Sequence, residues 1–318
     1  MIEVSHLTKR YGAHTAVSDL SFTIEDGQIY GFLGPNGAGK STTMNIMTGC
    51  LAASSGDVRI DGHDIFEDSY EAKKLLGYLP EQPPLYLDRT PAEYLHFVGM
   101  AKGLRGTKLE EQIERVMSVT QTADVSNRLI KNLSKGYRQR VGIAQALLGD
   151  PKVVILDEPT VGLDPIQIIE IRDLIKDLGR EHTVILSSHI LSEVQAVCQT
   201  ILIISKGKLV ACDTAENLER LFAGTATVEL TAECSVEEAQ RLLGGLANVT
   251  ALRAEPISEA KCGIRLETET SDGEGICREC FRIFSRAGLP LLRMDTTRAS
   301  LEDIFIELTG DRKEDDEA

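Results

Sequence analysis

A glycine-rich segment that ends in lysine and serine is the strongest chemical signal in the sequence. It reads Gly34-Pro35-Asn36-Gly37-Ala38-Gly39-Lys40-Ser41, after the apolar run Ile29–Leu33 and before a helix expected from Lys40 to about Thr48. Glycines at this spacing let backbone N–H groups turn toward phosphates, and a helix N-terminus adds its positive dipole end. We expect Lys40 to reach the β- and γ-phosphates and Ser41 to bind Mg²⁺, with Thr42 beside them. The segment therefore predicts a site for a nucleoside triphosphate and Mg²⁺.

Two acidic residues, Asp157 and Glu158, follow a second apolar run, Val153–Leu156. A carboxylate at the end of a buried parallel strand points into the crevice at the carboxyl edge of the sheet. We expect Asp157 to bind Mg²⁺ and Glu158 to polarise a water that attacks the γ-phosphate. Taken alone, an acid in this position is more often a helix or turn cap. Its pairing with the glycine-rich segment favours the catalytic interpretation.

The elements that must position these groups alternate between strand and helix. The first 75 residues are rich in strand patterns such as Leu20–Ile24, and helical patterns follow over about residues 88–148. Val153–Leu156 and Val184–Leu186 then read as apolar strands on either side of an amphipathic helix, Pro165–Leu178. Such alternation is typical of a parallel sheet covered on both faces. We predict the α/β class, with an antiparallel β subdomain and a helical subdomain.

Two helix starts in the helical stretch have the pattern of a capping box. They are Thr90-Pro91-Ala92-Glu93 and Thr107-Lys108-Leu109-Glu110. In this pattern the threonine side chain and the glutamate side chain satisfy each other's backbone N–H groups. We expect a helix to begin at each, and the second to bury one stripe of apolar side chains, Leu109, Ile113, Val116 and Met117.

A new pattern starts near residue 225 and reads strand, helix, strand, strand, helix, strand, helix. Its expected helix starts are Ser235-Val236-Glu237-Glu238, Ser271-Asp272-Gly273-Glu274 and Ser300-Leu301-Glu302-Asp303. The order βαββαβ predicts a ferredoxin-like α+β module. Its expected core comprises Val228, Leu230, Leu242, Leu243, Ile264, Phe281, Ile283, Leu291 and Ile304. Residues 311–318 form a charged run that we expect to be a disordered acidic tail.

The net charge and the lengths of the apolar runs exclude some classes of protein. The 318 residues carry a formal net charge of −15, from 49 acidic and 34 basic residues. Residues 225–318 hold 20 of these acids and 11 of these bases, so this part alone carries −9. Such a surface repels phosphate backbones, which argues against nucleic-acid binding. No apolar run approaches the ~18 residues of a membrane span, and the N-terminus lacks a signal-peptide pattern. We expect a soluble cytosolic protein.

The seven cysteines are an odd number and are scattered along the chain. This argues against a disulfide framework and for reduced thiols. Only Cys277 and Cys280 have C-x-x-C spacing, without a second pair or a later histidine. Two buried thiols on a helix are the favoured interpretation over zinc or redox chemistry.

Between the two nucleotide motifs lies Leu133-Ser134-Lys135-Gly136-Tyr137-Arg138-Gln139-Arg140. With these motifs in this order, about residues 1–220 resemble the ATP-binding-cassette (ABC) ATPases, and this segment looks like the family signature LSGGQ. The resemblance implies a P-loop NTPase (RecA-like) core that binds ATP. It also implies that Ser134 caps the following helix and, with the Gly136 N–H, meets the γ-phosphate held by an opposing cassette. Lys135 and Tyr137 depart from the consensus and receive no role.

Further positions match the family residue by residue. Gln82 looks like the glutamine that contacts magnesium and the attacking water, and His189 like the switch histidine at the γ-phosphate. Tyr11 stands where family members stack an aromatic ring on adenine, although it could also simply pack a hairpin. Gly162-Leu163-Asp164-Pro165 resembles the loop that crosses the dimer interface. The resemblance divides the chain into an ABC ATPase domain over 1–222 and an accessory domain over 223–310.

The resemblance also implies a function. The signature, the Gly162 segment and the ending Ser300–Gly310 look like those of drug, antibiotic or polysaccharide exporters. This implies an ATP-hydrolysing subunit, peripheral on the cytoplasmic face of the cell membrane, that pairs with a second cassette and powers a separate membrane permease. The alternatives are a soluble ABC ATPase of translation or DNA repair, and a P-loop kinase for a small molecule.

Overall fold

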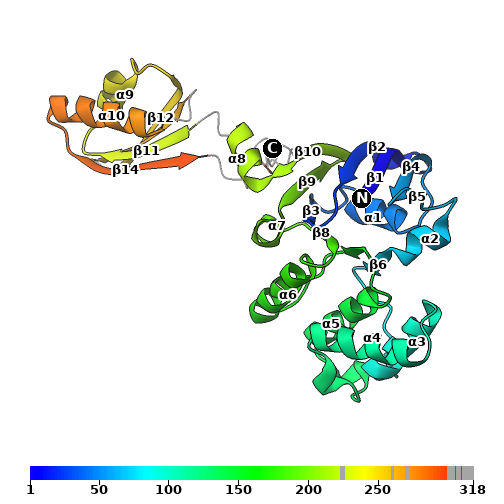
Figure 1. Ribbon diagram of the computed structural model, residues 1–318. Helices are drawn as coiled ribbons and strands as arrows, with labels where there is room; N and C mark the ends of the chain where they lie inside the picture. The colour runs from blue at the N-terminus through cyan, green and yellow to red at the C-terminus, as the bar shows by residue number, and fades with distance from the viewer. Residues whose placement is uncertain (223–225, 259–260, 269–272, 299–304, 306–308, 310–318) are drawn as a thin grey trace. The chain divides into compact units, whose positions relative to one another are not determined.

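The chain forms two compact units, Met1–Thr214 and Ala215–Ala318 (Figure 1). The computed structural model describes residues 1–222, 226–258, 261–268, 273–298, 305 and 309. The division falls before the helix α8 (Ala215–Phe222), which groups with the second unit. The domain bounds predicted from the sequence, 1–222 and 223–310, instead put these residues in the first domain. The predicted acidic tail, 311–318, lies outside the described residues.

A six-stranded sheet forms the centre of the first unit, in the order β10-β9-β3-β8-β7-β6. The five strands from β9 to β6 run parallel, and β10 pairs with β9 in the antiparallel sense. This confirms the parallel sheet expected from the apolar runs, since strands buried on both faces need few polar residues. The bounds are β3 (Ile29–Leu33), β6 (Leu76–Leu79), β7 (Val153–Leu156), β8 (Thr183–Ser188), β9 (Thr200–Ser205) and β10 (Lys208–Thr214).

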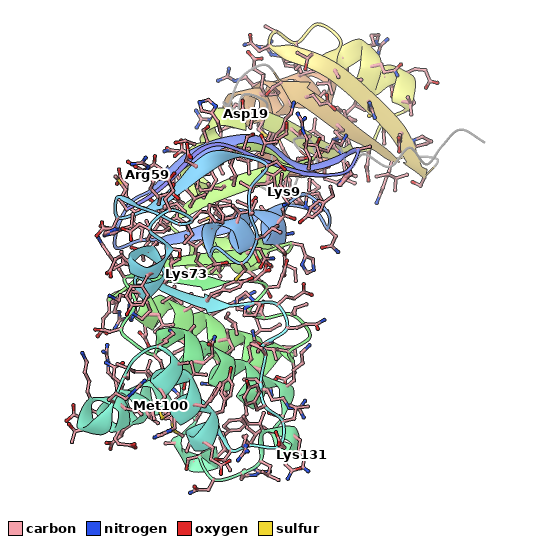
Figure 2. The ribbon with its side chains drawn as sticks, turned by 90° about the vertical axis from the view of Figure 1, so that its right-hand side faces the viewer. Lys9, Asp19, Arg59, Lys73, Met100 and Lys131 are labelled. Carbon is pink, nitrogen blue, oxygen red and sulfur yellow. The ribbon has the colours of Figure 1, made fainter. Side chains whose placement is uncertain are left out.

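An antiparallel sheet lies at one end of the first unit, in the order β2-β1-β4-β5. Figure 2 shows this sheet, which carries Lys9 and Asp19, and the helical region with Met100 and Lys131 at the opposite end of the unit. The register of the first strand shifts between Val4 and Leu7, where His6 has a φ of 50°, so its apolar residues do not alternate strictly. The bounds are β1 (Ile2–Tyr11), β2 (His14–Ile24), β4 (Ser55–Ile60) and β5 (His63–Asp64).

The helical region confirms one predicted capping box and contradicts the other. The Glu93 N–H donates to Thr90 Oγ1, and the Thr90 N–H donates to the Glu93 carboxylate at 3.0 Å. The next helix begins at Gly106 with Arg105 as its N-cap, so the Thr107 box does not form. Gly106 turns the chain with a φ of 56°, which places Thr107 inside the first helical turn. The helices are α3 (Pro91–Ala101), α4 (Gly106–Val119) and α5 (Lys135–Leu147).

The predicted apolar stripe of α4 is buried. Four more α-helices belong to the described part of the first unit. None of the helices within the described residues is long and apolar enough to span a membrane. The remaining helices are α1 (Lys40–Met47), α2 (Ser69–Lys74), α6 (Pro165–Leu178) and α7 (Leu191–Val197).

The second unit has the predicted βαββαβ order. Its antiparallel sheet has the strand order β12-β13-β11-β14, which is the ferredoxin-like arrangement. The Ser235 capping box forms at the start of its first helix, whereas the Ser271 and Ser300 starts fall at residues that are not described. The bounds are β11 (Ala226–Ala232), α9 (Val236–Leu243), β12 (Val249–Ser258), β13 (Lys261–Thr268), α10 (Gly273–Ala287) and β14 (Leu291–Arg298).

The core of the second unit is close to the predicted one but uses a different aromatic ring. Phe281 is 57% exposed, while Phe284 is fully buried. The buried face of α10 runs through Ile276, Cys277, Cys280 and Phe284, and Phe281 lies one residue beyond this stripe. Among the other predicted residues, Val228, Leu230, Leu243 and Ile264 are buried, Leu242, Ile283 and Leu291 are partly buried, and Ile304 is not described.

The two cysteines of the C-x-x-C segment are packing residues. Cys277 and Cys280 are free thiols in the buried face of α10. Burial raises the pKa of Cys280 to about 12, so this thiol stays protonated and unreactive at neutral pH. This confirms the prediction of two buried thiols on a helix.

The two threonines predicted as caps provide a matched pair for a stability test. Thr90→Ala removes a cap that forms and is expected to destabilise the first unit by about 1 kcal/mol. Thr107→Ala removes an exposed side chain that caps nothing, so we expect a change within about 0.5 kcal/mol. Urea unfolding followed by circular dichroism measures both. Equal losses of stability would contradict the assigned helix starts.

Candidate active site

A cavity of about 480 Å³ lies at the carboxyl edge of the parallel sheet. Consecutive residues 36–42, from the loop after β3 into the first turn of α1, form one wall, and Tyr11 from β1 lies at the rim. Glu158 follows β7 and His189 follows β8, so two parallel strands deliver the opposite wall. The remaining lining residues are His14, Ala16, Glu81 and Val161. The fold therefore brings most of the sequence-predicted residues around one space.

The glycine-rich segment wraps this cavity because two of its residues adopt conformations that favour glycine. Gly37 has a φ of 80° and Gly39 a φ of 104°. Lys40, only 6% exposed, donates from Nζ to the backbone carbonyls of Gly34 at 2.7 Å and Pro35 at 3.3 Å. Burial lowers the pKa of Lys40, and the nearby Glu158 and Asp157 carboxylates oppose this shift. The loop thus holds a cation beside the N-terminus of α1, a suitable place for a phosphate group.

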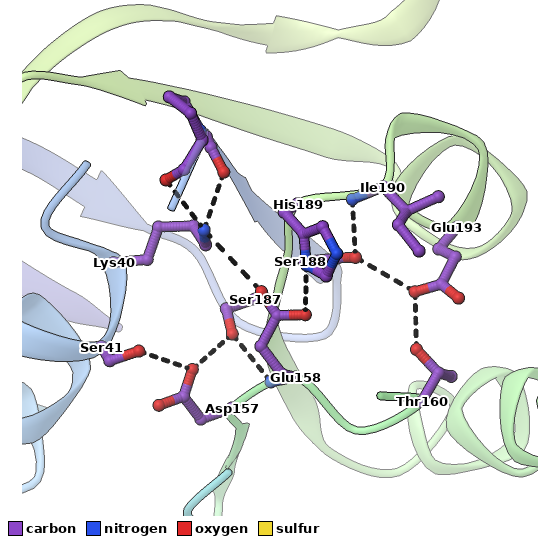
Figure 3. Close-up of polar contacts among 12 residues, drawn as sticks. Lys40, Ser41, Asp157, Glu158, Thr160, Ser187, Ser188, His189, Ile190 and Glu193 are labelled. Carbon is purple, nitrogen blue, oxygen red and sulfur yellow. Dashed lines mark hydrogen bonds and ion pairs between the residues drawn. The ribbon is translucent and has the colours of Figure 1, made fainter. Parts of the chain in front are cut away.

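Asp157 is buried beside the cavity and does not line it, but it connects three segments, one of which carries the lining residue Ser41. Its Oδ1 accepts hydrogen bonds from Ser41 Oγ at 3.2 Å and from Ser187 Oγ at 2.5 Å (Figure 3). Asp157 is 2% exposed, so these hydroxyls replace the water that the carboxylate loses on burial. The carboxylate and the Ser41 hydroxyl are adjacent oxygen donors, as the sequence predicted for magnesium.

The Glu158 carboxylate lies between a lysine side chain and a histidine side chain. Its Oε1 lies 3.7 Å from Lys40 Nζ, and its Oε2 lies 3.0 Å from His189 Nδ1. Its backbone is left-handed, with a φ of 48°, and its N–H donates to Ser187 Oγ at 2.8 Å. A left-handed conformation costs a non-glycine residue about 1–2 kcal/mol, and such strain is common at functional sites. The strained turn aims this carboxylate into the cavity.

A second buried acid, Glu193 on α7, organises the residues that flank Glu158 and His189. Its Oε2 accepts hydrogen bonds from Thr160 Oγ1 at 2.6 Å and from Ser188 Oγ at 3.0 Å (Figure 3). Arg172 on α6 lies 3.9 Å from its other oxygen. No sequence motif pointed to Glu193 or Ser187. The only local signal was the pair of serines, 187 and 188, at the end of an otherwise apolar strand.

Gln82 is not among the residues that line the cavity. It is exposed after β6, and its neighbour Glu81 lines the cavity instead. Tyr11 lies at the rim, 49% exposed, with the Lys9 ammonium 5.1 Å from its ring centroid. The Lys9 ammonium thus lies over one face of this half-exposed ring.

Ser134 and Gly136 lie in a different hollow of the first unit. Ser134 is the N-cap of α5 and accepts a hydrogen bond from the Tyr137 N–H at 3.3 Å, as predicted. With Gly136 and Asp164, it lines a separate cavity of about 530 Å³ that shares no residue with the first. The Tyr137 hydroxyl donates to Asp124 at 2.9 Å. Within one chain, the structure therefore does not bring Ser134 to Lys40.

The donor set around Ser41 fits magnesium better than a transition metal. Both predicted protein ligands that meet there, Ser41 and Asp157, offer oxygen. Within the described part of the chain, no group of three or more histidine, cysteine or acidic residues is placed to hold a metal. Magnesium typically takes only one or two protein oxygens and completes its shell with phosphate and water.

Comparison with known proteins agrees with this geometry. Residues 17–161 match the model of the ABC transporter family. An uncharacterized ABC transporter ATP-binding protein of Bacillus subtilis (strain 168), YhcH, is 36% identical over 99% of this chain and 98% of its own length. The lantibiotic transport ATP-binding protein SrtF of Streptococcus pyogenes is 38% identical over 70% of this chain and 96% of its own.

A solved structure, the dimeric bacterial ABC transporter cassette MJ0796, is 26% identical. It covers 67% of this chain and 98% of its own, with a TM-score of 0.61. This likeness confirms the P-loop NTPase core that the resemblance implied. The relatives favour the transporter interpretation over a soluble non-transport ATPase or a small-molecule kinase. The chain belongs to the ATP-binding proteins of ABC transporters, and it is an ATPase subunit of such a system.

Proposed function

We propose that this chain powers an exporter by hydrolysing Mg²⁺-ATP between two cassettes, with Glu158 as general base. The supporting observation is the position of the Glu158 carboxylate in the cavity wall, 3.0 Å from His189 and 3.7 Å from Lys40. A carboxylate in such a position can accept a proton from a water that attacks the γ-phosphate. Lys40 would bind the β- and γ-phosphates, and His189 would contact the γ-phosphate across from Glu158.

The remaining residues of the cavity bind and orient the nucleotide. Residues 36–42 would surround the phosphates with backbone N–H groups, and Tyr11 would stack on the adenine. Ser41 and Asp157 would hold the Mg²⁺ ion, which neutralises charge on the β- and γ-phosphates. Gln82 is proposed to reach this ion only after its exposed segment moves inward, and Glu81 is the acid that lines the wall in this conformation.

The separation of Ser134 from Lys40 supports a shared site. In a head-to-tail pair, Ser134 and Gly136 of each chain would meet the γ-phosphate held by the other chain's glycine-rich segment. Such a pair is isologous and contains two equivalent sites. ATP binds the closed pair better than the open one, so binding favours closure and hydrolysis reverses it.

The partner in this proposal is a separate membrane permease, with the cassette on the cytoplasmic face of the membrane. The relative SrtF belongs to lantibiotic transport, and we extend this class to the present chain as export of a peptide-like antimicrobial compound. The second unit acts as an accessory domain that stabilises the pair of chains. Copurification with a permease and substrate-stimulated ATPase activity would test the assembly.

Glu158→Gln preserves the size and hydrogen bonding of the side chain but removes its basicity. We expect the rate of ATP hydrolysis to fall by about 10²–10⁴-fold while ATP affinity is retained and an ATP-bound dimer accumulates. Phosphate release and size-exclusion chromatography measure these effects. Glu67→Gln, an exposed acid before α2, is the control. Lys40→Ala should instead weaken ATP binding itself. Near-normal turnover of Glu158→Gln would refute the assigned base.

Mixing two inactive variants tests whether the site is shared. In a pair of one Ser134→Ala chain and one Lys40→Ala chain, one site carries both defects and the other carries neither. We expect partial recovery of ATPase activity in the mixture and none in either parent. Absence of recovery, with mixed dimers demonstrated by differential tagging, would argue for a self-contained site or strict coupling of two sites.

Truncation tests the proposed division of the chain. A chain ending at Ala223 retains every residue of the cavity, so we expect ATP affinity to be unchanged within about twofold. Dimer affinity or coupled transport should change. A second truncation after Thr214 removes α8 as well and shows with which unit this helix functions. Loss of ATP binding in a folded chain ending at Ala223 would show that the second unit belongs to the catalytic core.

A further inference from the structure

The helices α9 and α10 pack on one face of the ferredoxin-like sheet, so neither of them covers the other face. The face on which they pack carries the core residues Val228, Leu230 and Ile264 (Figure 1). Successive residues of a strand point to opposite faces, so their neighbours in sequence lie on the other face. These neighbours include exposed charged residues on all four strands. We call this surface the outer face.

The charges of the outer face form an ordered row across the sheet. In strand order, Arg253 of β12 lies opposite Arg265 of β13, Arg265 lies opposite Glu229 of β11, and Glu229 lies opposite Asp295 of β14. The row therefore reads positive, positive, negative, negative. The next row begins with Glu255 on β12, passes through Gly263 and Thr231, and ends with Arg293 on β14. In this row the edge strand β12 carries the negative charge and the edge strand β14 the positive one, which is the reverse of the first row.

This arrangement of charges destabilises the sheet of a single chain. Like charges directly opposite each other on neighbouring strands destabilise a sheet, and the first row contains two such pairs, Arg253 with Arg265 and Glu229 with Asp295. Two intrachain ion pairs relieve part of this cost. Arg293 Nε donates to Asp295 Oδ2 at 2.5 Å, and Arg265 lies 4.0 Å from Glu229. All four side chains are largely exposed, so solvent weakens both pairs. A partner with the opposite order of charges would relieve both like-charge pairs.

The outer face is neutral as a whole, in a domain that is strongly acidic. Residues 225–318 carry 20 acids and 11 bases. The described side chains of the outer face carry four bases and four acids, namely Arg253, Lys261, Arg265, Arg293, Glu229, Glu255, Glu267 and Asp295. The acidic surplus therefore lies elsewhere, and no net positive charge is present to attract a polyanion. This argues against nucleic acid or an anionic lipid surface as the partner.

We propose that the outer face binds the outer face of a second copy of this chain. A two-fold axis parallel to the strands, between β11 and β13, places β12 of one copy on β14 of the other and β13 on β11. Arg253 then faces the second copy's Asp295, and Arg265 faces its Glu229. The same rotation places Glu255 against Arg293 in the next row. Every charge in the two rows meets its opposite, which is the complementarity that selects a partner.

The shape of the outer face agrees with this pairing. A hollow of about 410 Å³ lies over Thr231 and Gly263, within the ring of charged residues. Ile257 is 61% exposed beside it and leans over Gly263. Because the axis exchanges β13 with β11, Ile257 of each copy comes over the Thr231 side of the other copy's hollow. Burial of these two isoleucines adds an apolar contribution to the contact.

The size of the face indicates a weak contact. Four strands about 4.8 Å apart, with roughly seven residues each, present on the order of 450 Å² per copy. Twice this area is below the roughly 1,200 Å² of stable interfaces. The contact would therefore act on chains that the cassettes already hold together, where the effective concentration is high. In this respect the inference rests on the proposed cassette dimer.

Charge reversal in the full-length chain tests the pairing. Arg253→Glu with Arg265→Glu makes the first row entirely negative, and Glu229→Arg with Asp295→Arg makes it entirely positive. Each variant alone should self-associate at least about tenfold more weakly than the unmodified chain, because like rows face each other. An equimolar mixture should form heterodimers at least as tightly as the unmodified chain. Because the contact alone is weak, sedimentation equilibrium without nucleotide is carried out at high chain concentration, at low and high salt, and circular dichroism checks folding.

Matched controls separate this contact from general electrostatic attraction and from the cassette dimer. Arg278→Glu with Arg282→Glu changes the net charge by the same amount on the exposed side of α10. Mixed with the positive-row variant, it should show no gain in association. The proposal would be overturned if the mixture of the α10 variant with the positive-row variant associated as tightly as the mixture of the two outer-face variants. It would also be overturned if the two outer-face variants associated no more tightly in their mixture than each does alone. ATP-dependent dimerisation in the Glu158→Gln background is measured separately, so failure of the cassette dimer leaves this result readable.

Discussion

The hydrogen-bond register of three parallel strands determines where the reactive groups of this protein lie. β3 pairs with β8 so that Leu33 lies opposite Ser188, and β7 pairs with β8 so that Leu156 lies opposite Leu186. The carboxyl ends of the three strands therefore meet at one edge, and the glycine-rich loop, the acidic pair and His189 all emerge there. A shift by one residue would turn the side chains of a strand to the opposite face. The cavity is thus a consequence of sheet pairing between segments far apart in sequence.

Burial of acidic groups makes this geometry specific. Asp157, Glu158 and Glu193 are all less than 10% exposed, and an unpartnered carboxylate in such a position would strongly destabilise the fold. Hydroxyl groups and cations from neighbouring segments supply the partners. Glu193 in particular bonds to Thr160, on the turn after Glu158, and to Ser188, immediately before His189. Movement of one turn relative to the other strains a buried hydrogen bond, so the two segments that form this wall of the cavity are coupled through Glu193.

Local sequence patterns were sufficient for the parallel strands and for much of the site. The bounds of β3, β7 and α6 coincide with the predicted ranges. The two strands are apolar runs that end at a glycine or an acid, and an aspartate N-cap followed by proline fixes the start of the helix. Prediction failed where a helix start or a buried face depends on an adjacent residue or on packing against another element. Gly106 starts α4 before the Thr107 box, and the choice between Phe281 and Phe284 depends on which side of α10 meets the sheet. Gln82 was assigned by resemblance, yet its place relative to the cavity depends on a loop conformation that no local pattern encodes.

The order of the strands in the sheet has a consequence for how the chain is made. β3 pairs only with β8 and β9 among the described strands, and these lie about 150 residues later in the sequence. At ~5–20 residues per second, a ribosome needs roughly 10–30 s to supply them. During this interval the antiparallel strands β1, β2 and β4 can already pair, whereas the apolar segment Ile29–Leu33 has no neighbour in its sheet. The nascent chain must therefore keep this apolar segment from misassembly until β9, which ends at Ser205, has been made, and chaperones can bind it in this interval.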